Sequence, residues 1–425
     1  MDVRGTPAAG LTGATLGFFI GFAAVSLFGP TAKVLQESTG VSAGLAGLLI
    51  SIPNLSGSLL RIPFSAMVDR DGGRRPFLVL LSLSIIGILG LYIIMRQSAE
   101  TIATAYPLLL LFGILGGCGI ATFSVGISQT SYWFPQKRQG AALGTYAGIG
   151  NLAPGIFAFV LANLTIPRYG LAGSYLIWFA FVAVGTVVYI IIGRNAWYFQ
   201  LRKAGNSPQA SRAEAGRRGQ ELFPKASVME SLKSSAAVWQ TWALVAVYFT
   251  TFGGFMALTA WLPRYWNALH SVSLGISGSL AALYSITASL LRVAGGPVSD
   301  KAGGVPTALA ALTATLVGAL ALSFNPGLAL SIVAIVLMAI GMGVGNAAVF
   351  KLVPQYVPHS VGGAAGWVGG LGAFGGFVIP NILSAFLRTG EAGDVGYARG
   401  FMTFAALAVV SMAIVVILRR EGRKS

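Results

Sequence analysis

Charged residues are scarce in this chain of 425 residues: Asp, Glu, Lys and Arg make up 9% of it, whereas 55% is hydrophobic. A soluble domain carries about 25% charged residues, so most of this chain does not face water. Apolar runs of membrane-spanning length, about 20 residues, recur from end to end, and the mean hydropathy is +0.76. The sequence therefore predicts an integral membrane protein.

The apolar runs predict an all-α protein that crosses the membrane twelve times. The expected membrane-spanning helices lie near 11–35, 42–67, 76–95, 104–128, 140–163, 172–193, 237–263, 273–298, 304–323, 327–350, 362–387 and 397–418.

Residues that bind metals or carry out catalysis are also rare. The chain has one cysteine, Cys118, and two histidines, His270 and His359, both expected in loops. A single cysteine excludes a disulfide framework and a thiolate metal site within one chain, and we expect no intramembrane metal site. No acid/base pair, nucleophile–base arrangement or phosphate-binding loop is visible in the helices. We therefore expect neither an enzyme nor a bound cofactor, and the lack of a nucleotide motif argues against ATP-driven transport.

Basic residues dominate the few charges, and the formal net charge is +16. Most of the Lys and Arg fall in the segments that share a side with both termini. This asymmetry follows the positive-inside rule, which places both termini in the cytoplasm. The basic residues therefore indicate orientation in a lipid bilayer and contact with anionic lipid, and they do not indicate a nucleic-acid partner.

One long polar stretch divides the apolar runs into six and six. Residues 194–236 contain "GNSPQASRAEAGRRGQELFPK", a composition that suits a cytoplasmic linker with little fixed structure. We therefore expect an N-terminal six-helix bundle over 1–193, this linker over 194–236, and a C-terminal six-helix bundle over 237–425.

The two halves repeat each other in sequence. "SLLRIPFSAMVDRDGG" (58–73) aligns with "SLLRVAGGPVSDKAGG" (289–304). Gly144, Gly148 and Gly150 likewise align with three later glycines, Gly366, Gly370 and Gly372. Parallel six-plus-six repeats are typical of the major facilitator fold, in which an axis along the membrane normal relates two six-helix bundles by pseudo-two-fold symmetry.

Two arginines, Arg61 and Arg292, occupy equivalent places in the repeats. Each precedes by eight residues an aspartate, Asp69 or Asp300, that meets the cytoplasm, which puts it about 12 Å into the membrane at about 1.5 Å per residue. An arginine at that depth costs at least about 2.5 kcal/mol, and its charge cannot be titrated away. No acidic residue lies mid-membrane in the sequence. We therefore expect the partner of both guanidinium groups to be a substrate oxyanion, such as a carboxylate or nitrate.

These residues and several motifs resemble those of the NarK-type nitrate/nitrite porters of the major facilitator superfamily. The most specific motifs are "GTYAGIGNLAPG" (144–155) and "GWVGGLGAFGGFVIP" (366–380), supported by "YWFPQKRQGAALG" (132–144) and "VDRDGGRR" (68–75). The resemblance implies that Arg61 and Arg292 bind the anion. It also implies that three aromatic rings sandwich the anion and that one amide lies at the site: Phe123, Tyr248, Phe252 and Asn151. Without the resemblance, core packing would be the preferred role for each aromatic residue.

The glycines of these motifs allow close approach of helices, which can then slide or rock as the halves exchange access. Those that we single out are Gly144, Gly148, Gly150, Gly366, Gly370, Gly372, Gly375 and Gly376. Charged residues at the cytoplasmic helix ends suggest gate pairs: Asp69 with Arg70, Arg74 and Arg75, and Asp300 with Lys301. The alternative is that these charges only set the topology.

We therefore expect a monomeric secondary transporter in the cytoplasmic (inner) membrane that moves small inorganic anions, nitrate and nitrite, by alternating access. Two fixed positive charges make the empty site costly to reorient, and this favours exchange of nitrate for nitrite. Proton-coupled nitrate symport is the alternative, although no titratable group lies near the centre. More remote alternatives are an exchanger of another oxyanion such as oxalate or formate, an anion channel, and a nutrient sensor.

Overall fold

The computed structural model describes residues 3–224, 228–324, 327–357, 361–387 and 393–421, and no strand occurs among them. The helices of the first half are α1 Pro7–Phe22, α2 Ala32–Thr39, α3 Ala43–Leu59, α4 Arg61–Asp71, α5 Arg74–Met95, α6 Ala99–Thr104, α7 Tyr106–Gly117, α8 Thr122–Trp133, α9 Gln136–Asn151, α10 Ala153–Val160 and α11 Ile166–Ile192. Those that follow are α12 Trp197–Lys203, α13 Pro208–Arg217, α14 Val228–Ala236, α15 Trp239–Tyr248, α16 Gly254–His270, α17 Leu274–Ala302, α18 Gly304–Ser323, α19 Leu328–Tyr356, α20 Val361–Leu371, α21 Gly375–Phe386, α22 Gly393–Gly400 and α23 Met402–Glu421.

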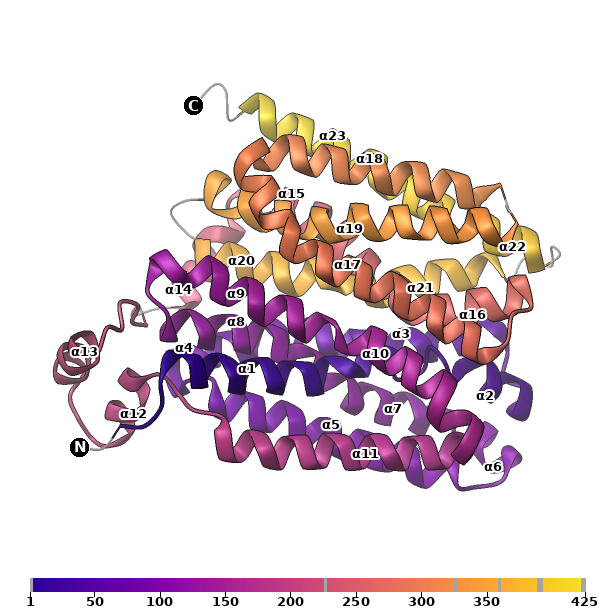
Figure 1. The fold of residues 1–425 in the computed structure, drawn as a ribbon, viewed down its shortest axis with the longest axis horizontal. Coiled ribbons are helices and arrows are strands. Elements are labelled where there is room, and N and C mark those ends of the chain that lie inside the picture. Colours follow the sequence, from indigo (N-terminus) through magenta and orange to yellow (C-terminus); the bar gives the residue numbers. More distant parts are fainter. Residues whose placement is uncertain (1–2, 225–227, 325–326, 358–360, 388–392, 422–425) are drawn as a thin grey trace.

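The described residues form eleven helical stretches that are long and apolar enough to cross a membrane. One of them, Ala142–Ile192, has 51 residues, and at 1.5 Å per residue this is more than twice the hydrocarbon thickness of about 30 Å. Gly170 breaks its helical backbone with a φ of 65°, and Figure 1 shows α11 running back beside the earlier helices. This stretch therefore crosses twice, and the prediction of twelve crossings is confirmed.

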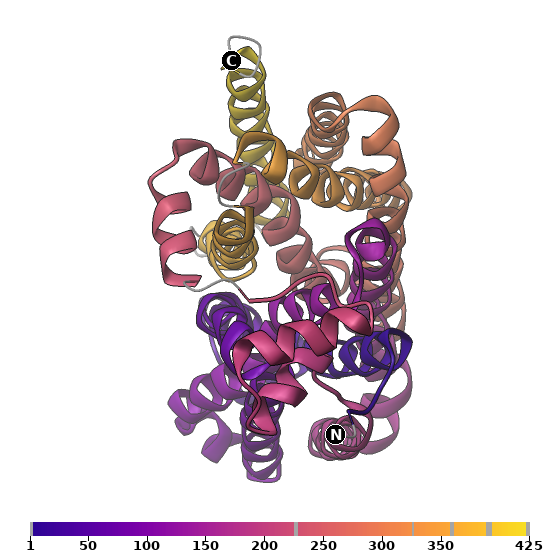
Figure 2. The ribbon, with the colours of Figure 1, turned by 90° about the vertical axis from the view of Figure 1, so that its left-hand side faces the viewer.

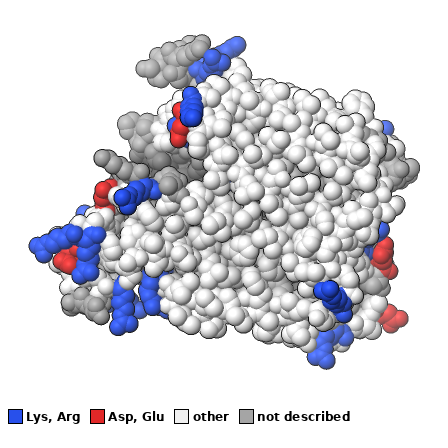
Figure 3. Space-filling view, in the orientation of Figure 1, with Lys and Arg blue, Asp and Glu red and all other residues white. Residues whose placement is uncertain are grey.

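Helices from the two ends of the sequence occupy different parts of the molecule. In Figure 1 the indigo to magenta helices up to α11 fill the lower part, and the orange to yellow helices from α15 onward fill the upper part. The two groups meet where α10 packs against α17 and where α3 packs against α21. The face drawn in Figure 3 is a broad uncharged surface with Lys, Arg, Asp and Glu gathered toward its ends, as expected for a chain embedded in lipid.

Several membrane-crossing helices are interrupted near their middles. Residues Cys118–Ala121 and Gly372–Phe374 form tight 3-10 turns, and Phe249–Gly253 forms a wide π turn. Leu60 separates α3 from α4, and Leu152 separates α9 from α10. Such irregular turns inside long helices often mark functional positions, and here they surround the centre of the molecule.

The prediction that residues 194–236 have little fixed structure is wrong. This segment contains α12, α13 and α14, and Figure 2 shows the first two lying across the end of the N-terminal helices. We call residues 194–224 the linker cap. Its aromatic side chains form a separate small core with Trp133 of α8 that includes Tyr198, Phe199, Leu201 and Ala215. Composition alone suggested a tether because the Arg, Gly and Ser content conceals these few apolar anchors.

Candidate anion site

Arg61 and Arg292 come from different parts of the molecule and approach the same two aromatic rings. Arg61 is the first residue of α4 and is 1% exposed, whereas Arg292 lies within α17. The guanidinium carbon of Arg61 lies 4.8 Å from the ring centroid of Phe123 and 5.1 Å from that of Phe252. The corresponding distances for Arg292 are 5.3 Å and 5.1 Å. Both cations therefore gain cation–π stabilisation from one shared ring pair.

The two rings of this pair also contact each other. The centroids of Phe123 and Phe252 are 5.7 Å apart and their planes differ by 27°, which lies in the range of directly packed aromatic pairs. Phe123 comes from α8, just after the 3-10 turn, and Phe252 comes from the π turn before α16. The irregular turns thus present one ring from each half of the chain to the same place.

Tyr248 and Phe350 extend the aromatic cluster. The ring of Tyr248 stacks on that of Phe252 at 4.9 Å with an interplanar angle of 8°, because the two residues are one turn apart. Phe350 of α19 packs edge-on against Tyr248 at 5.1 Å and lies 5.9 Å from the guanidinium carbon of Arg292. Sequence reasoning missed Phe350, which stands among apolar residues of α19 and has no distinguishing motif.

The guanidinium groups have more donors than their protein neighbours use. Arg61 donates through Nη1 to the carbonyl oxygen of Gly369, 3.0 Å away, and Nη2 lies 3.9 Å from Met256 Sδ. Its Nε, and Nη1 of Arg292, are buried without a hydrogen-bond partner in the described structure. No described carboxylate lies within ion-pair distance of either arginine, although a buried charge is costly without a partner.

The hydroxyl of Tyr248 shares this lack of a partner. It is buried beside the Arg61 and Arg292 guanidinium groups and makes no hydrogen bond of good geometry within the described residues, whereas buried polar groups in proteins are usually paired. The cluster thus holds unpaired N–H donors together with an unpaired hydroxyl. These groups can accommodate a small acceptor-rich anion, which would satisfy several of them at once.

The contacts of Asn151 lie at the junction of α9 and α17. It ends α9, its carbonyl oxygen accepts a 2.9 Å hydrogen bond from Ser289 Oγ of α17, and its side-chain Oδ1 is buried without a partner. Among the described residues, no hydrogen bond joins Asn151 to Arg61 or Arg292. Its side chain nonetheless remains an unpaired buried acceptor next to the junction of α9 and α17.

Most of the signature glycines lie at close contacts between helices. A Cβ on Gly150 would come within 1.9 Å of Phe18, one on Gly148 within 2.4 Å of Val293, and one on Gly372 within 2.7 Å of Tyr248. Gly370, Gly375 and Gly376 are similarly crowded, at 2.7 to 2.9 Å, whereas Gly366 has only ordinary contact at 3.4 Å. Gly144 is the exception, since nothing lies within 4 Å of its Cβ position.

The charged residues at the ends of α4 and α17 make different pairs from those predicted. Asp69 accepts a 2.5 Å hydrogen bond from the hydroxyl of Tyr132, and it is Asp71 that pairs with Arg75 and Arg70, at 3.1 and 3.7 Å. Arg74 Nη2 donates to the carbonyl oxygen of Ile190 at 2.7 Å.

Asp300 pairs with Lys351 of α19 rather than with Lys301. Neighbours in sequence on a helix point in different directions, so Asp300 and Lys301 do not pair in this conformation, and the role of Lys301 at a gate stays a prediction. Lys351 carries no sequence motif that would have marked it.

A third arginine is buried on the opposite side of the centre. Arg264 of α16 is 4% exposed, lies over the ring of Trp261 at 5.3 Å, and donates a 3.2 Å hydrogen bond to Gln36 Oε1 of α2. The apolar run predicted over 237–263 stops just short of Arg264, but α16 continues to His270. That histidine therefore ends a helix instead of lying in a loop, and His359 is outside the described residues.

Comparison with known proteins agrees with this architecture. A family model described as the Major Facilitator Superfamily matches residues 14–380 and 270–425. The probable nitrate/nitrite antiporter NarK1 of Thermus thermophilus is 30% identical over 393 residues, which cover 87% of this chain and 83% of that protein. The probable nitrate/nitrite transporter NarK2 of Mycobacterium tuberculosis is 29% identical and covers 97% of both chains. The nitrite extrusion protein of Bacillus subtilis is 28% identical, over 90% of this chain and 87% of that protein.

Solved structures of similar shape include two of a xylose transporter. The proton:xylose symporter XylE bound to 6-bromo-6-deoxy-D-glucose has a TM-score of 0.75 over 97% of this chain and 95% of its own, at 12% identity. A partially occluded inward open conformation of XylE from E. coli has a TM-score of 0.73 over 96% of each chain, at 13% identity. At such low identity the likeness shows the fold alone.

Proposed function

The chain belongs to the NarK-type nitrate/nitrite porters of the Major Facilitator Superfamily, and from that premise we propose that it exchanges nitrate for nitrite across the cytoplasmic membrane by alternating access. One observation carries the choice of substrate class. Arg61 and Arg292 approach one ring pair, and neither has a described carboxylate partner. A small planar anion is the group that matches two guanidinium forks. In this proposal the anion is the counter-ion that the described residues do not provide.

The ring pair must change its spacing before an anion can bind between the two rings. Two rings with centroids 5.7 Å apart are in direct contact, whereas a planar group between their faces needs about 7 Å, two contact distances of about 3.5 Å. Entry of nitrate between Phe123 and Phe252 therefore requires the rings to separate. Since one ring comes from each half, binding is coupled in this proposal to a small movement between the halves.

Electrostatic repulsion explains why exchange is favoured over net uptake. The two guanidinium carbons each lie 5.1 Å from the ring centroid of Phe252, so they are at most about 10 Å apart and repel by at least about 1.7 kcal/mol at an effective dielectric constant of about 20. Closing the site without an anion brings this repulsion into a region without water. A bound nitrate or nitrite removes the repulsion, so in this proposal the loaded site reorients and the empty site does not.

Within the same proposal, the contacts between the two halves indicate which state of the transport cycle this structure represents. On the side away from the termini, Asn54 donates to the carbonyl oxygen of Gly376 at 3.1 Å and Asn381 donates to Ser51 Oγ at 2.8 Å. Toward the termini, α9 and α17 touch at Gly148 but nothing lies within 4 Å of the Cβ positions of Gly144 and Gly296. The outer side is thus closed. Toward the termini, α20 still packs against α4, and the open space beside these two glycines of α9 and α17 corresponds in this proposal to a partly open inward-facing state.

Uptake into proteoliposomes tests the proposed exchange. Vesicles are loaded with nitrite or with an inert anion, and nitrate uptake is followed with and without an imposed proton gradient. We expect uptake that requires internal nitrite and does not respond to the proton gradient. Uptake driven by the proton gradient into nitrite-free vesicles would instead establish symport, and uptake of oxalate or formate in place of nitrate would overturn the assigned substrate.

A further inference from the structure

A second cationic site lies at the cytoplasmic end of the N-terminal helices, apart from the anion site. It is an open cavity of about 470 Å³ lined by the N-terminal segment, the start of α5, the residues after α11, and α12. Four basic residues line it, Arg4, Arg74, Arg194 and Lys203, and none of the residues that line it is acidic. Its volume lies within the range of about 300 to 1,000 Å³ found for small-molecule sites.

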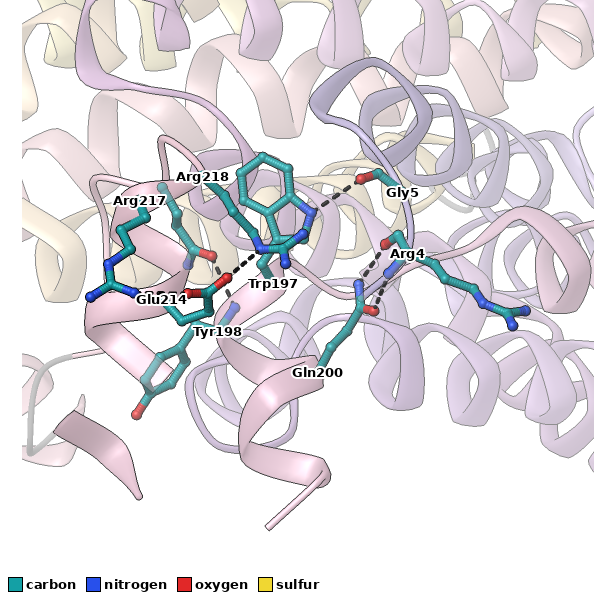
Figure 4. Close-up of polar contacts among 9 residues, drawn as sticks. Arg4, Gly5, Trp197, Tyr198, Gln200, Glu214, Arg217 and Arg218 are labelled. Carbon is teal, nitrogen blue, oxygen red and sulfur yellow. Dashed lines mark hydrogen bonds and ion pairs between the residues drawn. The ribbon is translucent and has the colours of Figure 1, made fainter. Parts of the chain in front are cut away.

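The walls of this cavity are held by specific contacts. Gln200 of α12 pairs with the backbone of Arg4, accepting from its N–H at 2.9 Å and donating to its carbonyl oxygen at 2.7 Å (Figure 4). Trp197 Nε1 donates to the carbonyl oxygen of Gly5 at 3.1 Å (Figure 4). Gly5 has a φ of 98°, and a Cβ there would lie 3.6 Å from Arg194 Cβ. The linker cap therefore fixes the N-terminal segment beside the basic side chains.

Three of these four basic side chains have no carboxylate partner among the described residues. Arg74, Arg194 and Lys203 have no ion pair in the part of the chain that the structure describes. Arg74 Nη2 is bound to the carbonyl oxygen of Ile190, in the last turn of α11, but its Nε is buried without a partner. Several positive charges that face one cavity repel one another, and an anion of matching size would stabilise them.

The cavity also lies at the level of the lipid headgroups. The membrane-spanning helices α5 and α11 reach this end at Arg74 and Ile192, and Arg194 follows directly. Phe199, Leu201 and Val3 add apolar surface to the same walls. Basic pockets at the cytoplasmic ends of membrane helices favour anionic lipid headgroups, and Arg binds phosphate through paired N–H donors.

We propose that this cavity is a binding site for a phosphate-bearing anion, held by Arg74, Arg194 and Lys203. The phosphate belongs either to the headgroup of an anionic phospholipid or to a soluble phosphate compound. The site is independent of the nitrate site and of the direction of exchange, because it shares no residue with the cluster around Arg61 and Arg292.

Occupation of this site would brace the loop between α4 and α5. Asn195 accepts a hydrogen bond from the backbone N–H of Arg74 at 2.8 Å and donates to the carbonyl oxygen of Asp71 at 3.1 Å. A phosphate that bridges Arg74 and Arg194 would hold the same loop to the end of α11. We therefore expect the bound anion to change the rate of transport more than the affinity for nitrate.

Native mass spectrometry of the full chain in detergent tests the proposal, with dioleoylphosphatidylglycerol, dioleoylphosphatidylcholine and inorganic phosphate as probes. The test variant is Arg194→Gln with Lys203→Gln, which leaves the Arg194 carbonyl and its hydrogen bonds in place. The control is Arg419→Gln with Arg420→Gln, which removes the same charge from exposed positions at the end of α23. Gel filtration and thermal melting verify that both variants fold.

We expect saturable binding of phosphatidylglycerol over phosphatidylcholine, weakened at least about tenfold in the test variant and unchanged in the control. Saturable inorganic phosphate binding that is lost in the test variant supports the same site with a soluble source. The proposal is overturned if neither probe saturates, or if the control loses binding as much as the test variant. If the unmodified protein binds phosphatidylglycerol but does not exchange nitrate, only the proposed function is contradicted.

Discussion

At the scale of single residues, the two central arginines differ in their protein contacts, but each keeps hydrogen-bond donors without a partner in the described structure. Arg61 uses two donors on Gly369 and Met256. Arg292 lies over the rings of Phe252 and Phe350 and beside the Tyr248 hydroxyl. Both keep a buried N–H without a partner. Under the proposed function, the site therefore depends on the planar fork of each arginine and not on its charge alone.

Replacement of either arginine by lysine tests this view. Lys keeps the charge but lacks the planar fork, and its compact ammonium group is more strongly hydrated. We expect Arg61→Lys and Arg292→Lys each to reduce nitrate exchange in proteoliposomes below about a tenth of the wild-type rate. Arg96→Lys, at an exposed position that contacts Tyr92, serves as the control. Near-normal exchange by both site variants would remove the two-arginine clamp from the proposal.

Removal of the Tyr248 hydroxyl distinguishes its effect on the stability of the fold from its effect on nitrate transport. A buried hydroxyl without a partner costs about 1 to 3 kcal/mol, and the ring alone makes the stacking contact with Phe252. Tyr248→Phe is therefore expected to raise the melting temperature. If the hydroxyl donates to the anion, the same variant raises KM for nitrate severalfold.

Thermal melting and initial-rate transport are both measured on this variant. A lower melting temperature would show that the hydroxyl has a partner that stabilises the fold. An unchanged KM would exclude contact with the substrate.

At the scale of the helix, two glycines six residues apart on α9 have different surroundings. The Cβ position of Gly150 collides with Phe18, whose ring is held by Phe22 and Tyr146, whereas that of Gly144 is open. Overpacking costs about 1 to 3 kcal/mol, and Gly to Ala in an open helical position gains up to about 1 kcal/mol.

We therefore expect Gly150→Ala to lower the melting temperature and Gly144→Ala to leave it unchanged or raise it. The variants have the same chemistry on one helix, so each is the control for the other. Equal losses in both would contradict the close packing of Phe18 against Gly150 and the open space beside Gly144. A loss of exchange in a stable Gly144→Ala variant would indicate that helices close on this position in another conformation.

How much could be predicted from the sequence depended on whether a residue belonged to a repeated pattern. Arg61, Arg292 and the glycine motifs stood out because they recur in both halves, and hydropathy predicted the helices that carry them. Phe350, Lys351 and the Arg61 contact with Gly369 depend on how distant helices meet, which no local pattern shows. The folded linker cap escaped prediction for a related reason, since its core is completed by Trp133 from α8.

At the scale of the whole molecule, the halves touch differently at their two ends. In the proposed orientation, hydrogen bonds from α3 to α21 close the outer side, whereas the Cβ positions of Gly144 on α9 and Gly296 on α17 are open toward the cytoplasm. Under alternating access, the outer contacts must break in every transport cycle. Exchange should therefore stop when a covalent bond holds them.

A disulfide across this outer contact tests that requirement. Ser51 Oγ and Asn381 Nδ2 lie 2.8 Å apart on α3 and α21, so Ser51→Cys with Asn381→Cys places two thiols across the halves. The buried native thiol is first removed as Cys118→Ala, so that no other cysteine competes. We expect oxidation to abolish nitrate exchange and reduction to restore it.

The control pair lies within one half, where rigid-body movement leaves distances unchanged. Ser65 Oγ of α4 and Ser128 Oγ of α8 lie 3.1 Å apart, and Ser65→Cys with Ser128→Cys should form a disulfide without stopping exchange. Rocking of one bundle against the other is the general mechanism expected for this fold, and it predicts this difference between the two pairs. Full exchange by the oxidised Ser51→Cys/Asn381→Cys variant would contradict opening of the outer side between α3 and α21. Equal inhibition of both pairs would instead indicate that movement within the N-terminal helices, and not between the halves, carries the anion across.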